Sequence, residues 1–451
     1  MAKKKQIELT IEEKLQNALV SKEEQPYKIP NNWCWTYFKD IFYIENGYAF
    51  KKIDYKKEGI PLVRISNIEN GIVNINECIY VNKLEKNEEK YVIEKGDLLI
   101  ALSGATTGKN GVYYLDEIAY LNQRIGNIKI KNKEKVLNEY RNYYIALKNE
   151  DILNLAYGGA QPNISPKVIE FISIPLPPIK EQQRIVNRIE SLFAKLDRAK
   201  ELIENTLAQF EQNKMAILHK AFTGELTAKW RKENNIDLSS WEKIKLGKVL
   251  LPMQTKKPTG QFFRYIDIDA IDNKRQIVKA PKLILTEKAP SRASRGVETG
   301  NILFSMVRPY LKNIAQIDSD LSDCIASTGF YVCRCKPELN SRFLYYLFIF
   351  DKTIDYLMQF MKGDNSPSIR KDDLLNMKID LPTIEEQQEI VNILDNLLAK
   401  YNKIKNLEQQ LEKIELLKKA ILAKAFRGEL GTNNPDEESA ENLLKEILAE
   451  K

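Results

Sequence analysis

One long unit occurs twice in this chain. The run LPPIKEQQRIVN at residues 176–187 returns as LPTIEEQQEIVN at 381–392, and KAFTGEL at 220–226 returns as KAFRGEL at 424–430. The first pair is offset by 205 residues (381 minus 176) and the second by 204 (424 minus 220). Solenoid repeats have periods of roughly 20–50 residues. The sequence therefore predicts a tandem duplication of a whole domain together with its connecting segment.

Both connecting segments have the apolar spacing of a coiled coil. In the first, apolar positions alternate in steps of four and three from Ile185 to Phe210, which is a heptad seam. The second seam begins at Ile390 and loses one residue between Ile404 and Leu407, a slip that overwinds a coil locally. A single amphipathic helix on a globular core would show a similar seam. Two matched rods in one chain instead favour helices that pair with each other, and we expect antiparallel pairing.

The two globular segments match each other more weakly than the connecting segments do. Strands are predicted at 62–68 and 265–271, and a turn before a buried strand is predicted at 95–100 and 299–304. The mixture of short strands and helices indicates an α/β (α+β) fold. We expect an N-terminal helical arm (1–25), a first globular domain (26–178), a first coiled-coil helix (179–225), a second globular domain (226–383), a second coiled-coil helix (384–430) and a C-terminal tail (431–451).

The bulk composition is that of a globular protein without a membrane segment. No apolar run approaches the roughly 18 residues that a membrane helix needs. The net charge of +7 only slightly raises the expectation of a nucleic-acid partner. Five cysteines and one histidine favour a reducing compartment, and we expect a cytoplasmic protein.

No motif predicts catalysis. The loop from Gly104 to Asn110 resembles a phosphate-binding P-loop, but it is one residue short and has Asn110 where the magnesium-binding hydroxyl belongs. The single histidine, His219, is replaced by Ala423 in the second copy, and we expect it at the surface. No metal-ligand spacing is present, and no cofactor is expected in this chain. The sequence predicts a protein that is not an enzyme.

The polar loops differ between the two copies, whereas the apolar scaffold matches. Two readers of different target sequences would differ in this way, although neutral drift after duplication would leave the same pattern. Arginine can bridge guanine, and asparagine or glutamine can bridge adenine; loop residues of these kinds can also contact phosphates. The candidate DNA-binding residues are Arg64, Ser103, Thr106, Thr107, Lys109, Arg124, Gln161 and Asn163 in the first copy, and Arg264, Arg308, Tyr310, Lys312, Ser366, Ser368 and Arg370 in the second.

These features resemble the DNA-specificity subunits of type I restriction-modification systems. The most specific marks are the repeated openings at Leu176 and Leu381, the repeated closings at Lys220 and Lys424, and the loop at 103–108. The resemblance covers essentially the whole chain. It implies that each globular domain is a target-recognition domain that reads one half of a split site on double-stranded DNA. It also implies antiparallel rods that set the spacer, pseudo-two-fold symmetry and chain ends that lie near one another.

The resemblance also implies partner subunits. Two methyltransferase subunits would dock on the central helices with S-adenosylmethionine, and restriction subunits would bring ATP and magnesium. The helix ends that carry over as partner surface are Glu181, Gln182, Gln183, Arg184 and Phe222, and Glu386, Gln387, Gln388, Glu389 and Phe426. Alternatively, the glutamines merely form a first helical turn and Phe222 caps the seam. Two other functions remain open at this point: a DNA-modifying enzyme in its own right, and a coiled-coil scaffold without a nucleic-acid role.

Overall fold

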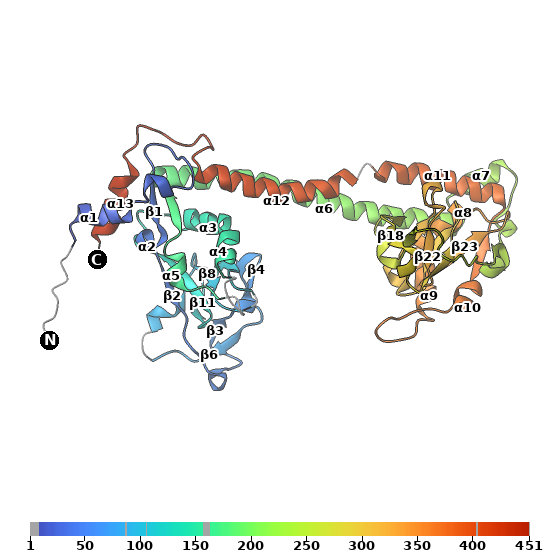
Figure 1. Ribbon diagram of the computed structural model, residues 1–451, viewed down its shortest axis with the longest axis horizontal. Helices are drawn as coiled ribbons and strands as arrows, with labels where there is room; N and C mark the ends of the chain where they lie inside the picture. The colour runs from blue at the N-terminus through green and yellow to red at the C-terminus, as the bar shows by residue number, and fades with distance from the viewer. Residues whose placement is uncertain (1–8, 86–87, 105, 157–162, 403–404, 451) are drawn as a thin grey trace. The chain divides into compact units, whose positions relative to one another are not determined.

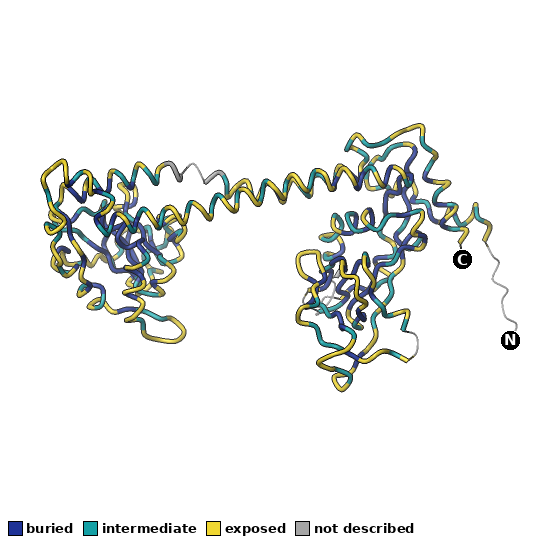
Figure 2. The backbone as a smooth tube through the Cα atoms, turned by 180° about the vertical axis from the view of Figure 1, so that it is seen from behind, coloured by how far each residue is buried: buried dark blue, intermediate teal, exposed yellow. Residues whose placement is uncertain are grey.

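The computed structural model describes residues 9–85, 88–104, 106–156, 163–402 and 405–450. The chain forms two compact units, one from Met1–Glu201 with Gln410–Lys451 and the other from Leu202–Gln409. Figure 1 labels their helices and strands, and Figure 2 shows a buried interior with exposed turns in each. Within the described residues, no helix is long and apolar enough to cross a membrane. We call the two bodies unit 1 and unit 2.

Unit 1 contains two sheets and a two-stranded ribbon. The ribbon pairs β1 (Cys34–Tyr37) with β12 (Ser173–Leu176). The six-stranded sheet has the order β2 (Phe42–Asn46), β11 (Ile125–Ile130), β8 (Leu98–Ala101), β9 (Asn110–Val112), β5 (Gly71–Val73) and β4 (Ile68–Glu69). The four-stranded sheet has the order β6 (Ile79–Val81), β3 (Ile60–Val63), β10 (Ala119–Leu121) and β7 (Val92–Ile93).

The helices of unit 1 bring the two ends of the chain together. Thr10 and Glu13 form a capping box at the start of α1 (Ile11–Ala18). Leu15 of α1 shares one apolar core with Leu444 and Ile447 of α13 (Ala440–Ala449), as the family resemblance implied. The remaining short helices are α2 (Phe38–Ile41), α3 (Asn138–Leu147), α4 (Asn149–Ala156) and α5 (Pro166–Ile169).

The predicted connecting helices are present, and they are antiparallel in unit 1. The first is α6 (Ile179–Phe222), and the second is described as α11 (Ile384–Asn402) and α12 (Lys405–Phe426). Asp197 pairs with Lys418 at 2.5 Å, and Lys200 pairs with Glu415 at 3.0 Å. As residue numbers rise along α6 they fall along α12, which confirms antiparallel pairing. The predicted one-residue slip involves Ile404, which lies outside the described residues.

Unit 2 repeats this architecture. The ribbon pairs β13 (Glu242–Lys245) with β24 (Lys378–Leu381), and a second pair joins β16 (Ile271–Asp272) and β17 (Ile277–Val278). One sheet has the order β14 (Leu250–Leu251), β23 (Phe330–Cys335), β20 (Ile302–Ser305) and β21 (Ile314–Gln316). The other has the order β18 (Lys282–Leu285), β15 (Phe262–Ile266), β22 (Ile325–Ser327) and β19 (Ala293–Gly296). The helices are α7 (Ala228–Glu233), α8 (Ser341–Ile349), α9 (Asp351–Met358) and α10 (Lys371–Leu375).

Matching strands confirm the predicted duplication, with one correction. The strands predicted to run to Ile68 and Ile271 end at Val63 and Ile266, and a turn of 3-10 helix follows each. The cause is a side-chain oxygen that accepts a backbone N–H across the turn. Asn67 accepts from Arg64 at 3.0 Å, and Asp267 accepts from Ala270 at 3.1 Å. Such local bonds compete with the strand ladder.

Candidate nucleic-acid interface

Three loops converge where strand β8 ends in unit 1. Leu102, just after the strand, donates its N–H to the carbonyl of Arg124 at 2.9 Å and accepts at its own carbonyl from Ile164 N–H at 2.8 Å. Ser103 also forms a bridge with Asn163. We call residues 102–104, 106–109, 122–124 and 163–165 loop cluster 1. Backbone bonds bring the three loops of this cluster together.

The same three loops converge where β20 ends in unit 2. Met306 donates its N–H to the carbonyl of Gly329 at 2.9 Å and accepts from Ile369 N–H at 3.0 Å, while Val307 bridges Ser368. We call residues 306–312, 328–329 and 366–370 loop cluster 2. These three backbone contacts correspond to the three described for loop cluster 1.

Loop cluster 1 contains most of the residues predicted for the first copy. Arg64 lies next to it, because β3 and β10 are parallel and Asn122 N–H donates to the carbonyl of Val63 at 3.2 Å. Thr107 is buried, and its hydroxyl donates to the carbonyl of Gly104 at 2.6 Å, so it shapes the loop. Gln161 lies outside the described residues. The exposed side chains are those of Thr106, Arg124 and Asn163, and Arg64, Ser103 and Lys109 are half-buried.

Loop cluster 2 exposes most of the residues predicted for the second copy. Lys312 is engaged internally, since its ammonium pairs with Asp351 and donates to the carbonyl of Ile349 at 3.2 Å. Arg308 and Lys312 have φ angles of 47° and 50°, in the left-handed region that non-glycine residues rarely adopt. Such outliers cluster at functional sites. The exposed side chains are those of Arg308, Tyr310, Ser366 and Arg370, and Ser368 is half-buried.

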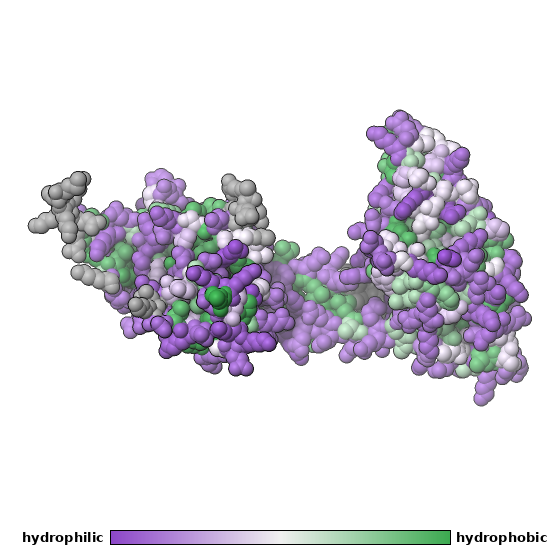
Figure 3. Space-filling model, turned by 90° about the horizontal axis from the view of Figure 1, so that it is seen from below, coloured by the Kyte–Doolittle hydropathy of each residue, from purple (hydrophilic) through white to green (hydrophobic). Residues whose placement is uncertain are grey.

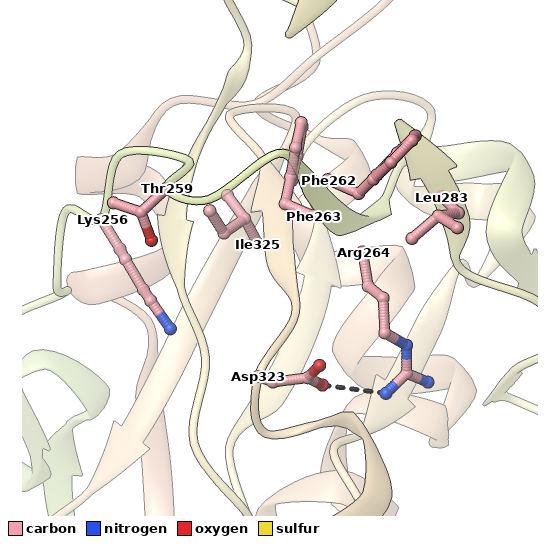
Figure 4. Close-up of a pocket in the computed structure, with 8 residues that line it drawn as sticks. All are labelled: Lys256, Thr259, Phe262, Phe263, Arg264, Leu283, Asp323 and Ile325. Atoms are coloured by element: carbon pink, nitrogen blue, oxygen red, sulfur yellow. Dashed lines mark hydrogen bonds and ion pairs between the residues drawn. The ribbon is translucent and has the colours of Figure 1, made fainter. Parts of the chain in front are cut away.

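Arg264 does not lie in loop cluster 2. Its guanidinium pairs with the Asp323 carboxylate at 2.8 Å, in a shallow hollow that includes Phe262 and Leu283 (Figure 4). Strands β15 and β22 are parallel, and Asp323 precedes β22. The ion pair therefore lies where these strands begin, whereas the cluster lies where they end. The structure therefore does not bring Arg264 together with the other candidates of the second copy.

Gln182 and Gln387, which were predicted as partner surface, are buried and make hydrogen bonds within their own units. Gln182 accepts from Leu137 N–H at 3.1 Å and donates to the carbonyl of Lys135 at 3.1 Å. Gln387 accepts from Asn340 N–H at 2.8 Å and donates to the carbonyl of Glu338 at 3.0 Å. Both side chains are fully buried. Each one joins the start of a connecting helix to the start of α3 or α8, and neither side chain reaches the surface of its unit.

Phe426 is also internal. It is fully buried, and its ring lies 5.0 Å from both the Tyr140 and the Tyr144 rings. Phe222 is half-buried and stacks on Phe350 at 5.3 Å. The residues of the predicted partner surface that reach solvent at least in part are Gln183, Arg184, Phe222, Gln388 and Glu389.

Two buried glutamates form networks whose internal role was not predicted. In unit 1, Glu181 accepts from the Thr432 hydroxyl at 2.6 Å and from Arg184 at 2.6 Å, and Arg184 also binds Glu437 at 2.7 Å. Burial raises the pKa of Glu181, while the hydrogen bond from Arg184 lowers the pKa of Glu437. A sequence signal existed: Glu181 precedes the first seam residue, Ile185, by four positions and so lies on the buried face.

The equivalent network in unit 2 uses a different arginine. Glu386 accepts from the Thr227 hydroxyl at 2.6 Å, from Arg231 at 2.5 Å and from the Trp241 indole at 2.9 Å. Arg231 lies in α7, which follows the end of α6, whereas Arg184 lies on α6 next to its glutamate. Both networks fasten the segment after one connecting helix to the start of the other helix.

Potential metal ligands do not cluster in the part of the chain that the structure describes, and two of the thiols are buried enough to stay protonated. No group of three or more His, Cys, Asp or Glu residues could hold a metal ion among the described residues. Burial raises the pKa of the Cys78 and Cys324 thiols to about 11, which keeps them protonated at neutral pH. His219, expected at the surface, is half-buried, with its ring 6.1 Å from that of Phe350. In each unit, the face shown in Figure 3 is largely hydrophilic.

Comparisons with known proteins agree with this arrangement. A family model described as the type I restriction modification DNA specificity domain matches residues 30–209 and again residues 241–416. The Escherichia coli type I restriction enzyme EcoBI specificity subunit is 27% identical over 94% of this chain and 93% of its own length. The E. coli EcoKI specificity subunit is 25% identical over 94% of this chain and 96% of its own length.

Solved structures show the same fold. A structure described as the structural basis of complex assembly and conformational transition of the type I R-M system has a TM-score of 0.67 at 21% identity, covering 90% of this chain and 100% of that chain. The HsdS subunit from Thermoanaerobacter tengcongensis has a TM-score of 0.52 at 21% identity, with the same coverage. The chain belongs to the family of type I restriction-modification DNA specificity subunits, and it contains two target-recognition domains.

Proposed function

We propose that this chain is the non-catalytic subunit that gives a type I restriction-modification complex its DNA sequence specificity. Loop cluster 1 reads one half of a bipartite site, and loop cluster 2 reads the other half. The observation that carries the proposal is the pair of equivalent loop clusters. Equivalent backbone bonds join three loops in each cluster, and they present different side chains, such as Arg124 and Asn163 in one cluster and Tyr310 and Arg370 in the other. Loops on a rigid scaffold are a common way to build variable recognition.

The chemistry of the exposed residues suits DNA. Arginine, asparagine and serine can donate to base edges in the major groove, and the same residues can bind phosphates. We propose that phosphate contacts supply most of the affinity and that a few base contacts in each cluster supply specificity. Two methyltransferase subunits would dock on the connecting helices, and restriction subunits would join them. S-adenosylmethionine, ATP and magnesium would belong to these partners.

Footprinting of the complex with its methyltransferase partner tests the proposal. We expect two protected half-sites separated by an unread spacer. Methylome sequencing should show that Arg124→Ala with Asn163→Ala relaxes only one half-site, and that Tyr310→Ala with Arg370→Ala relaxes only the other. Each lost base contact should cost about 1–3 kcal/mol of discrimination. Arg264→Ala is the matched control, because Arg264 is an arginine of unit 2 outside the cluster. A single continuous footprint would contradict the proposal.

A further inference from the structure

A hairpin loop extends from loop cluster 2. Lys362 and Ser368 close it with two backbone hydrogen bonds, at 3.0 and 2.9 Å. Gly363 has a φ of +100°, which permits the turn. Residues 363–366 are all exposed, and none of their side chains makes a hydrogen bond within the described part of the chain. We call residues 362–368 the hairpin loop; it lies between α9 and α10 (Figure 1).

Arg308 holds this loop at two points. Its backbone N–H donates to the carbonyl of Pro367 at 2.8 Å, and its guanidinium Nη2 donates to the carbonyl of Asn365 at 2.8 Å. Among the described residues, no other hydrogen bond from outside the loop reaches residues 363–367. Arg308 itself has the left-handed backbone conformation described above. A non-glycine residue keeps that conformation only where its surroundings determine it, and here the hairpin loop supplies the bonds.

We propose that Arg308 is a positioning residue for sequence reading by the second target-recognition domain. It fixes the hairpin loop so that the exposed edge of Asp364, Asn365 and Ser366 meets DNA in one conformation. This inference rests on the proposed function, and it changes the role first expected for Arg308, which was direct contact with DNA. An exposed loop of four residues has many conformations in solution, and ordering it before binding removes that cost from recognition.

Hydrogen exchange on the full chain without DNA tests the positioning role directly. Arg308→Gly accepts the left-handed conformation, keeps the backbone N–H that bonds Pro367, and removes the whole side chain including the guanidinium that bonds Asn365. We expect exchange at the Lys362 and Ser368 amides to rise about tenfold, the size expected from loss of one hydrogen bond. Arg370→Ala is the matched control, because Arg370 is an exposed arginine in the same cluster, and the amides should keep wild-type exchange. Unchanged exchange in Arg308→Gly would overturn the proposal.

DNA binding with the methyltransferase partner present separates positioning from contact. Arg308→Gly should lower the ratio of specific to non-specific affinity about tenfold across several bases of one half-site. The dependence of log affinity on log salt should stay unchanged, because no phosphate contact is lost. A slope smaller by about 0.9 with wild-type exchange in the free chain would mean that Arg308 contacts a phosphate, and it would refute positioning. A wild-type complex without a bipartite site would refute the proposed function instead.

Discussion

The buried carboxylate of Glu386 should be one of the largest single contributors to the stability of unit 2. It is fully buried and accepts hydrogen bonds from Thr227, Arg231 and Trp241 at 2.5–2.9 Å. Glu386→Leu would leave the Arg231 guanidinium, whose side chain is only 8% exposed, without an anion. Removing one partner of a buried ion pair costs about 3–5 kcal/mol. We expect the free energy of unfolding of unit 2 to fall by about 4 kcal/mol.

A double-mutant cycle with Arg231→Leu isolates the pair. Arg231→Leu alone should cost about 3 kcal/mol, because Thr227 and Trp241 still donate to the carboxylate. The double variant should cost only about 0–2 kcal/mol, because two apolar side chains can replace a buried ion pair nearly neutrally. Lys243 and Asp380 form the matched control in the same unit, with a 3.7 Å separation and side chains 69% and 53% exposed. Breaking that pair should cost at most about 1 kcal/mol.

Urea unfolding of the full chain, followed by tryptophan fluorescence, measures these differences, since Trp241 lies in the network. With a slope of about 2 kcal/mol per molar urea, a loss of 4 kcal/mol lowers the midpoint of unit 2 by about 2 M. If Glu386→Leu shifted the midpoint no more than the control pair does, the network would not hold unit 2 together, and the reasoning would be refuted.

Three further predictions concern unit 1. Gly47→Ala should lower the free energy of unfolding by more than about 2 kcal/mol, or unfold the scaffold of loop cluster 1, because the added Cβ would lie 2.2 Å from the Asn122 carbonyl oxygen. Thermal unfolding measures this loss. Gly71→Ala is the control: Gly71 has a φ of +79° but open space around it, so the loss should be smaller. Phe426→Ala should lower the free energy of unfolding, measured in urea, by about 3–5 kcal/mol, because the buried ring packs on Tyr140 and Tyr144. A loss as small as that of an exposed substitution would contradict the internal position of Phe426. Because the folded-state pKa of Glu437 is lowered, this carboxylate stabilises the fold above its unfolded-state pKa near 4.5, and the stabilisation is lost as pH falls through the folded-state pKa. Glu437→Gln should therefore reduce the difference between the free energies of unfolding at pH 7 and at pH 3. A variant with the same pH dependence as the wild type would contradict this sign.

The repeat made most of the architecture predictable. Heptad spacing predicted α6, and matched turns predicted the buried strands β8 and β20. These features are local, because spacing and turn residues act within a few positions of each other. The ends of the predicted strands were wrong, since the bonds of Asn67 and Asp267 across short turns leave no periodic signal.

The candidate site was less predictable, because it depends on pairing between distant segments. Arg264 and Arg308 look alike as basic residues in the sequence. The parallel pairing of β15 with β22 shows that Arg264 lies where these strands begin, whereas Arg308 lies where the loops converge. The repeated glutamines were recognised, but their burial was missed. Gln182 precedes Val186 by four positions, and that spacing would have placed it on the buried face.

The loop clusters differ between the two copies, whereas Gln182 and Gln387 at the starts of the connecting helices match. The different hydrogen-bond chemistry of these two regions accounts for the contrast. In the loop clusters, backbone atoms make the bonds that position the loops, as in Leu102 with Arg124 and Met306 with Gly329. The side chains of Thr107, Arg308 and Lys312 add bonds of their own, but backbone atoms make the scaffold that the two clusters share. Under the proposed function, a duplicated domain could therefore acquire a new target without losing that scaffold. At the helix starts, the side chains of Gln182 and Gln387 make the bonds, and a substitution would leave buried partners unpaired. Under the proposed function, specificity depends on loop side chains, whereas the scaffold depends on backbone bonds within the loops and on buried side chains at the helix starts.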